Sequence, residues 1–295
     1  MNRVLLYVHF NKNDRLSEYV VYQLIQMRKL FDEIVFISNS SLPNDDKRRI
    51  GDVCDGVLIR KNSGYDFAAW RDGIKMIGWS KLSKFDSITL MNDTCFGPVY
   101  PMDNVYKKME NMDIDFWGIT DHAASPDGMP GSNDPIPSHI QSYMTVYNRN
   151  VVGSKIFHDF WNNVNDHQDV TEVIRRYETQ LTRILKKAKF TYKVLFNTEE
   201  YSKIHKILLY NYSELLPLIL IRNSVPLLKI KSFKHTPARL IKYELRKTSY
   251  PLELVDGHLK LVNIKTVGLL KYYLKSMRIS LIRRLKMVYN KSNEK

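Results

Sequence analysis

The sequence predicts an α/β fold with a mainly parallel, doubly wound sheet and helices on both faces. Strand-like and helix-like segments alternate over the first 120 residues, with short connections between them. Such alternation is typical of parallel sheets, because the crossover between two parallel strands is usually a helix. The chain has 295 residues, of which 44% are hydrophobic, and this is enough for a large core.

The elements follow from two periodicities. Strands are indicated by short runs of β-branched and aromatic residues, and helices by apolar residues that recur every three or four positions. We expect strands at residues 4–10, 33–38, 56–60, 87–91, 115–119 and 141–147, and helices at residues 16–30, 67–77, 154–163 and 170–187. Residues 122–138 are rich in Pro, Gly, Ser and Asp, which favour neither element. We interpret them as a long loop that covers a ligand site as a lid.

The positive charge of the chain is concentrated at its end. The net charge is +14, and residues 231–295 contain 16 Lys and Arg against 4 Asp and Glu. We therefore predict a domain of residues 1–230 and a basic helical extension of residues 231–295. Apolar residues recur at helical spacing between residues 267 and 288, with basic residues between them. Such a helix either lies on an anionic membrane surface, through residues 265–295, or packs on the domain. Without a nucleic-acid-binding motif, nucleic acid is not an expected partner.

The sequence also indicates where the protein works. No run reaches the roughly 18 uncharged apolar residues of a spanning helix, and the chain starts with a strand-like run in place of a leader. The two cysteines, Cys54 and Cys95, form no metal-binding or disulfide pattern, and we expect both to be buried. We therefore expect a cytoplasmic protein that is peripheral on the inner face of the cell membrane.

Two polar segments each follow a predicted strand. Residues 62–73 read Asn-Ser-Gly-Tyr-Asp-Phe-Ala-Ala-Trp-Arg-Asp-Gly, and residues 92–98 read Asn-Asp-Thr-Cys-Phe-Gly-Pro. Ligands of open α/β sheets bind beyond the carboxyl ends of the strands, so both segments are placed to form one site. Their glycine turn, carboxylates and neutral oxygens suit the ribose and diphosphate of a nucleotide sugar.

Asp93 is the natural metal ligand of this site, because a carboxylate at a strand end can hold Mg²⁺ or Mn²⁺ against two phosphates. Asn92 adds a neutral oxygen for the metal shell or the ribose. The alternative is a simple turn in which Asp93 caps the next segment, and these residues alone favour that alternative.

The first segment offers contacts to the nucleotide. Gly64 lets the backbone approach a ligand, and Asn62 and Asp66 lie in the same loop. Arg71 follows about one helical turn later and could bind phosphate; the alternative is a surface arginine paired with Asp72 or Asp66.

Direct sugar transfer with inversion needs one carboxylate as general base. Glu178 is the candidate, since it shares the inward face of the predicted helix at residues 170–187 with Leu181. Spacing alone favours an exposed glutamate at this position, so the assignment depends on a resemblance.

Taken in order, residues 62–70, 92–98, 115–120 and 141–143 resemble the rhamnan synthesis protein F family of bacterial rhamnosyltransferases. The resemblance runs from about residue 4 to residue 231. It implies a glycosyltransferase A-like fold, dTDP-L-rhamnose as the donor, a lipid-linked cell-surface glycan as the acceptor and a divalent metal. More distantly, the segments are similar to family 2 glycosyltransferases.

The resemblance also implies roles for single residues. Asp93 matches the last aspartate of an Asp-x-Asp motif, but Met91 stands where the first would be. Glu178 matches the second acid of an acidic pair, and Tyr177 replaces the first. His235 is a possible late metal ligand. Contacts to the sugar or acceptor are implied for Trp117, Asp121, His122 and Gln141.

The sequence thus leads to two hypotheses. The first is an inverting glycosyltransferase, a rhamnosyltransferase, that acts on a lipid-linked glycan. The second is a non-catalytic membrane-surface or glycan-binding scaffold, in which Met91 marks a lost site.

Overall fold

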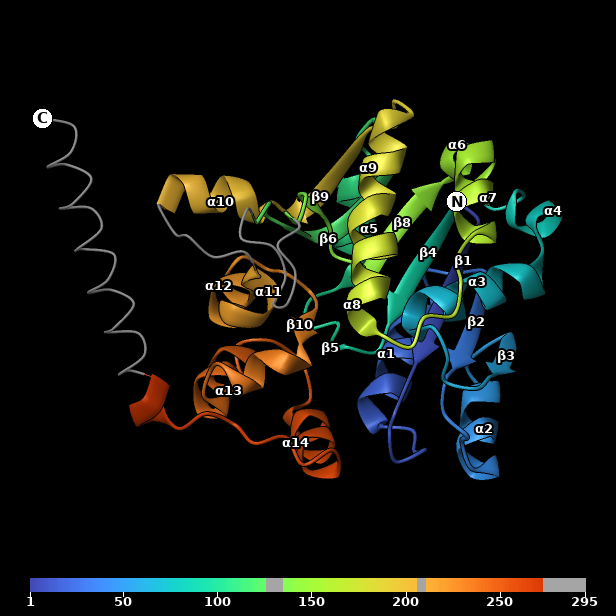
Figure 1. The fold of residues 1–295 in the computed structure, drawn as a ribbon. Coiled ribbons are helices and arrows are strands. Elements are labelled where there is room, and N and C mark those ends of the chain that lie inside the picture. The colour runs from blue at the N-terminus through green and yellow to red at the C-terminus, as the bar shows by residue number, and fades with distance from the viewer. Residues whose placement is uncertain (126–134, 206–210, 273–295) are drawn as a thin grey trace, which may run out of the picture.

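The computed structural model describes residues 1–125, 135–205 and 211–272. Its main sheet has the strand order β3-β2-β1-β4-β8-β6-β7, and β9 pairs with β6 (Figure 1). The strands are β1 (Arg3–His9), β2 (Glu33–Ser38), β3 (Gly56–Ile59), β4 (Ser87–Asn92), β6 (Phe116–His122), β7 (His139–Ile140), β8 (Met144–Asn148) and β9 (Tyr192–Phe196).

Most strand pairs in the first half of the sheet are parallel. β1 is parallel to β2 and β4, β2 is parallel to β3, and β6 is parallel to β9. β8 is antiparallel to both β4 and β6. The carboxyl ends of β1 to β4, of β6 and of β9 therefore meet the start of β8 at one edge of the sheet. The predicted mainly parallel α/β sheet is confirmed.

β1 lies at the centre of the fold because its side chains are buried on both faces. Leu5 and Tyr7 belong to one hydrophobic cluster, whereas Val4, Leu6 and Val8 belong to the other. Successive side chains of a strand point to opposite faces. A continuous hydrophobic run is therefore what a strand covered by helices on both sides requires.

Helices cover both faces, as predicted (Figure 1). The first face packs against α1 (Glu18–Arg28), α2 (Asn44–Gly51), α5 (Met102–Glu110), α12 (Pro217–Arg222), α13 (Ala238–Leu245) and α14 (Leu252–Leu261). The second face packs against α3 (Tyr65–Ile77), α4 (Trp79–Leu82), α6 (Arg149–Val152), α7 (Lys155–Asn162), α8 (Val170–Val173) and α9 (Thr179–Lys187). Two further helices, α10 (Thr198–His205) and α11 (Tyr212–Leu215), follow β9.

The helix predicted over residues 170–187 is not uniform. α8 and α9 are joined by a π-helical turn at Ile174–Glu178. The Thr179 hydroxyl donates to the Arg175 carbonyl oxygen at 2.9 Å within this region. Single π turns inside α-helices are frequent at functional sites, because the extra residue changes the direction in which side chains point.

The predicted strand at residues 141–147 is shorter than expected. β8 begins at Met144, and residues 139–140 form the separate strand β7, which pairs with the end of β6. Ser125 and Ile136 exchange two backbone hydrogen bonds of 2.9 Å. The two ends of the predicted loop are therefore paired, and the lid interpretation concerns residues 126–134, which lie outside the described residues.

The first hydrophobic cluster continues past the predicted boundary at residue 230. Phe233, Ile241 and Val255 all belong to it. The His258 ring lies 4.6 Å from the Tyr19 ring and hydrogen-bonds the Ser17 hydroxyl at 2.9 Å. The division at residue 230 stays a prediction, and most of the predicted basic helix falls beyond residue 272, outside the described residues. Both cysteines are free and buried, as expected.

Candidate active site

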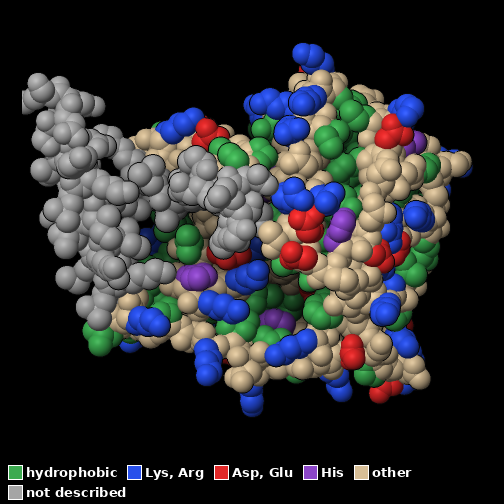
Figure 2. All heavy atoms as spheres, in the orientation of Figure 1, with side chains coloured by type: hydrophobic (Ala, Val, Ile, Leu, Met, Phe, Trp, Pro, Cys, Tyr) green, Lys and Arg blue, Asp and Glu red, His purple; other side chains and the backbone are tan. Residues whose placement is uncertain are grey.

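A cleft of about 410 Å³ opens at the sheet edge where the strand ends converge. Figure 2 shows this side of the molecule, where acidic, basic and histidine side chains lie close together around a hollow. Its lining residues are Tyr65, Asp66, Phe67, Asn92, Thr94, His122, Ile136, His139, Gln141, Ser142, Val170, Val173, Ile174, Glu178, Asn211, Glu214, Lys229 and Lys231.

Gly64 starts α3 in a conformation that favours glycine. Its φ is 71°, in the left-handed region. An added Cβ would lie 2.4 Å from the Ala68 Cβ and 3.0 Å from the Asp166 Cα. A side chain therefore does not fit here. The turn places Asp66 in the first turn of α3, where its Oδ2 accepts a 2.7 Å hydrogen bond from the Asn92 side-chain nitrogen.

Asp93 turns toward β1 and is not among the residues that line the cleft. Its Oδ2 accepts from the Phe10 backbone nitrogen at 3.0 Å and lies 4.0 Å from His9 Nε2. Burial lowers the pKa of His9 to about 4, so this histidine is neutral and forms no ion pair with Asp93 at neutral pH.

Two acids at this end of the sheet, Asp93 and Asp66, have raised pKa values. Burial raises the pKa of Asp93 to about 8; the Phe10 hydrogen bond opposes this and the charge of Asp66 adds to it. Burial raises the pKa of Asp66 to about 6, opposed by the Asn92 hydrogen bond and the charge of Lys229. Coupled, perturbed acids of this kind cluster at functional sites.

The site offers oxygen ligands, which Mg²⁺ and Mn²⁺ prefer. Across residues 1–125, 135–205 and 211–272, no three His, Cys, Asp or Glu side chains come together as a metal site, so the expectation for His235 is not supported. Asp93 lies outside the cleft lining and its raised pKa disfavours the ionised form that binds a cation, so the divalent metal and its Asp93 ligand stay predictions.

Glu178 closes the π turn and reaches the cleft. Its Oε1 accepts from the Ser142 backbone nitrogen at 3.1 Å and from the Ser142 hydroxyl at 2.8 Å. Burial raises the pKa of Glu178, but the charge of His139, the two Ser142 hydrogen bonds and the charge of Lys229 outweigh it and hold the pKa below its usual value. Glu178 is therefore ionised at neutral pH and can accept a proton.

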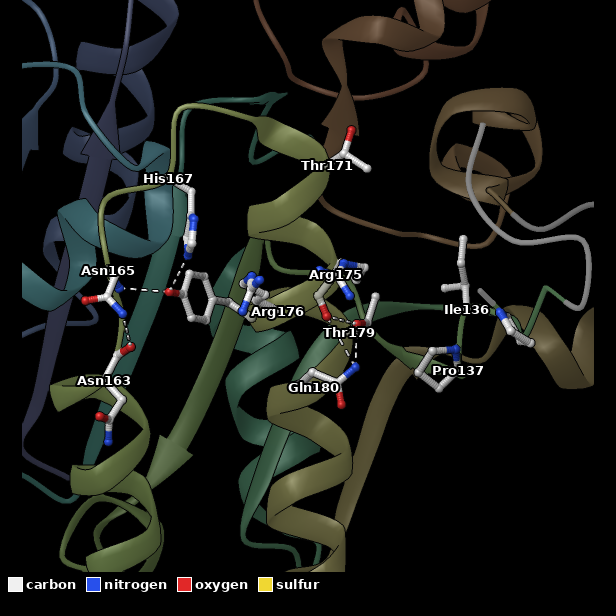
Figure 3. A pocket seen from close by; sticks show the side chains of 12 residues that line it. Ile136, Pro137, Asn163, Asn165, His167, Thr171, Arg175, Arg176, Thr179 and Gln180 are labelled. Atoms are coloured by element: carbon white, nitrogen blue, oxygen red, sulfur yellow. Dashed lines mark hydrogen bonds between the residues drawn. The ribbon is translucent and has the colours of Figure 1, made fainter. Parts of the chain in front are cut away.

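Tyr177 holds the π turn in place on the side away from the cleft. At this position the resemblance implies an acid. The Tyr177 hydroxyl accepts from the Asn165 backbone nitrogen at 2.8 Å and lies 3.0 Å from His167 Nε2 (Figure 3). Its ring stacks on Phe67 at a centroid distance of 5.7 Å. A second cavity, of about 560 Å³, opens on this side of the turn. Fixing Tyr177 also fixes the direction of the adjacent Glu178.

His122 and Gln141 line the cleft. The His122 and His139 rings stack at 5.2 Å, and each Nδ1 lies within 2.8 Å of a backbone carbonyl oxygen. Burial and the neighbouring His139 lower the pKa of His122. Gln141 is oriented by the Thr120 hydroxyl, which donates to its Oε1 at 2.7 Å. The two predicted contacts are thus in position, and their roles stay predictions.

Two other predicted contacts are corrected by the structure. Trp117 is only 1% exposed and packs edge-on against Tyr106 in the core, because its β6 position faces the helix layer. The Asp121 carboxylate accepts from the Thr198 and Glu199 backbone nitrogens at 2.6 and 3.3 Å. It satisfies the first amides of α10, so Asp121 is a helix cap.

Arg71 and Asn62 do not line the cleft either. Arg71 pairs with Asp72 at 2.7 Å and with Asp166 at 2.8 Å, which agrees with the alternative of an arginine paired with Asp72. It also donates to the Val164 carbonyl oxygen at 2.8 Å. Arg71 therefore ties α3 to the segment before α8, and Asn62 is exposed.

Several lining residues were not found from the sequence. Lys229, on β10 (Leu228–Lys229), and Lys231 come from a region whose apolar runs are ambiguous in type. No local motif marks these two lysines. Only the pairing of β10 with β5 (Cys95–Phe96) brings them to the site.

The sequence profile of the family described as Rhamnan synthesis protein F matches residues 34–291. The chain belongs to the rhamnan synthesis protein F family. A relative from Sinorhizobium fredii, the uncharacterized protein y4gN, is 27% identical over 173 residues, which are 59% of this chain and 43% of that protein. The match thus spans less than half the length of this relative.

Similar chain traces occur in solved structures. A putative nucleotide-diphospho-sugar transferase from Desulfovibrio desulfuricans has a TM-score of 0.40 at 12% identity, over 67% of this chain and 81% of the other. Core-mannan synthase A from Aspergillus fumigatus, in a form with Mn and GDP, has a TM-score of 0.35 at 8% identity, over 64% and 70%. These scores are too low to bear on function. The observed sheet agrees with the predicted α/β class with a mainly parallel sheet.

Asp93→Asn is expected to make the free energy of unfolding less dependent on pH. Asp93 has a pKa of about 8 when folded against a usual value of 3.8, so between these values the folded chain keeps a proton that the unfolded chain releases. Stability should therefore fall as pH rises from 4 to 8, and asparagine removes this contribution. Urea unfolding at pH 5 and pH 8 in EDTA measures it, with the exposed Asp113→Asn as control. An equal decline in wild type and Asp93→Asn would contradict the pKa of Asp93.

Proposed function

We propose that this chain transfers L-rhamnose from dTDP-L-rhamnose to a lipid-linked cell-surface polysaccharide, with inversion at the anomeric carbon. The observation that carries the proposal is the meeting of Asp66, Asn92 and Glu178 in one cleft at the carboxyl edge of the sheet. These residues come from segments far apart in the sequence. Together they supply a general base and polar groups for a donor, which is what direct sugar transfer requires.

The two sides of the cleft support a deoxysugar donor. Val170, Val173 and Ile174 come from α8 and the π turn and form an apolar wall with Ile136. Polar residues from the strand ends, Asn92, Thr94 and His122, line other parts of the cleft. A 6-deoxy sugar carries a methyl group in place of the C6 hydroxymethyl group, and a methyl group is favoured against an apolar wall.

The reaction follows from the position of Glu178. The acceptor hydroxyl oxygen attacks the anomeric carbon, the bond from that carbon to the diphosphate oxygen breaks, and its electron pair leaves with the nucleoside diphosphate. The Glu178 carboxylate takes the hydroxyl proton, while Ser142 orients Oε1 through two hydrogen bonds. A single displacement inverts the anomeric configuration.

The second hypothesis, a non-catalytic scaffold, is favoured by one observation. Met91 is fully buried, in the hydrophobic cluster of the first face. It therefore supplies no ligand in place of the missing aspartate, and the metal site keeps one carboxylate of the motif.

We also propose that the protein acts at the inner face of the cell membrane, where its acceptor is anchored. In the described ranges, no helix is both long and apolar enough to cross a bilayer. The support is the basic, amphipathic pattern of residues 265–295. Anionic headgroups attract such a segment, and its apolar stripe inserts among them.

A nucleotide-sugar panel tests the donor. Among dTDP-, UDP- and GDP-sugars, dTDP-L-rhamnose should raise the melting temperature most, because a ligand that binds only the folded state stabilises it by about 2.7 kcal/mol at 100 times its Kd. Differential scanning fluorimetry gives the shift, with dTDP-glucose as a comparison donor that has the same nucleotide, keeps the C6 hydroxyl and differs in ring configuration. A lack of response to every nucleotide sugar would favour the scaffold.

Glu178→Gln should lower the transfer rate about 10²- to 10⁴-fold, because glutamine keeps the shape but cannot accept the proton. Donor affinity should change little. Chromatographic assay of glycan product measures the rate, and Glu172→Gln is the control, since Glu172 lies on α8 away from the cleft and pairs with Arg175 and Arg176. Unchanged turnover in Glu178→Gln would refute the base assignment, and retention of the donor's anomeric configuration in the product would refute inversion.

Deleting residues 265–295 should abolish sedimentation with vesicles that contain anionic phosphatidylglycerol. The reason is that both the charge and the apolar stripe are removed. With neutral phosphatidylcholine vesicles, the full and the shortened chain should both stay in the supernatant. Co-sedimentation at low and at 0.5 M salt gives the bound fraction. Equal binding of the full and shortened chains would remove the membrane proposal.

A further inference from the structure

Lys229 is held beside the Asn92-Asp93-Thr94 motif by a short two-stranded sheet. β10 pairs antiparallel with β5, with Lys229 opposite Cys95. The Ile230 backbone nitrogen donates to the Thr94 carbonyl oxygen at 3.0 Å. These backbone contacts bring a residue from late in the chain directly to the end of β4, and they fix its position before any ligand arrives.

Among the described residues, the ammonium group of Lys229 has direct contacts with neutral groups. Its Nζ donates to the Thr94 hydroxyl at 2.9 Å and lies 4.8 Å from the centre of the Tyr143 ring. Within the described ranges, neither Lys229 nor Lys231 forms a side-chain ion pair at 4.0 Å or less. By contrast, Arg60 and Arg71 are both paired with Asp72. The two lysines therefore line the cleft without a direct ion pair, and they share it with the acids Asp66, Glu178 and Glu214.

The charge of Lys229 reaches the acids of the cleft without contacting them. For both Asp66 and Glu178, burial is the largest influence and raises the pKa, and the charge of Lys229 acts in the opposite direction. Lys231 acts on Asp66 in the same sense. Lys229 thus lies within electrostatic reach of the proposed base and of the donor-side carboxylate, in the space that a donor would occupy.

We propose that Lys229 binds the diphosphate of the nucleotide-sugar donor and stabilises the charge that develops on it as the bond to the sugar breaks, with Lys231 as a second cation. The inference rests on the proposed function. An ammonium group is a compact point charge with three donors, which suits phosphate oxygens. Because Lys229 is positioned by strand pairing, little reorganisation is needed when charge develops. The lysine supplies positive charge beside a motif that has lost one of its two carboxylates.

Binding of dTDP to the full chain tests the proposal by isothermal titration calorimetry. Lys229→Met should weaken dTDP binding about 10-fold or more, and Lys229→Arg should keep most of the affinity. The dTDP affinity of wild type should fall with salt concentration more steeply than that of Lys229→Met. The variant lacks the contact between the lysine charge and the diphosphate, which salt screens. Lys234→Met is the matched control, because Lys234 is exposed on the segment that follows β10 and does not line the cleft.

Thymidine is the second probe, because it has the base and sugar but no phosphate. Its affinity should be the same in wild type and Lys229→Met, with melting temperatures confirming that both are folded. Equal dTDP affinity in the two folded proteins would overturn the role of Lys229. An equal loss for thymidine and dTDP would also overturn it, since the lysine would then support the site as a whole. If wild type binds none of dTDP, UDP and GDP, the proposed function itself fails.

Discussion

The candidate site depends on the antiparallel insertion of β8 between β4 and β6. Because β8 runs against both neighbours, its first residues lie beside the last residues of β4 and β6. Asn92, His122 and Ser142 are thereby brought to one edge, although about 50 residues separate the first from the last. Ser142 then holds Glu178 from the other side of the cleft. Without this strand direction the motifs would lie at opposite ends of the sheet.

Charge is the second constraint on the cleft. Burial makes ionisation of Asp66 and Asp93 costly, and each carboxylate is supported by hydrogen bonds and by the nearby Lys229. The acids come from the first third of the chain and the lysine from the last third. The C-terminal region is therefore part of the electrostatics of the site, in agreement with its packing on the first face of the sheet.

Side-chain packing explains which site predictions failed. Trp117 and Asp121 lie on β6 beside His122, and residue type made each a reasonable contact. Alternation along the strand sends Trp117 into the core, and the start of α10 takes the Asp121 carboxylate as a cap. Neither the burial of Trp117 nor the capping by Asp121 can be predicted from the residues around the motif. The Tyr106 ring and the α10 amides come from other segments.

By itself the sequence determined the α/β class, most strand and helix positions, the family and the segments that carry Asp66, Asn92 and Glu178. These follow from local periodicity and from motifs, which need no partner to be recognised. Only the tertiary structure decided the π turn that aims Glu178, the inward or outward direction of neighbouring site residues and the arrival of Lys229. Each of these depends on contacts between distant segments, such as the pairing of β10 with β5.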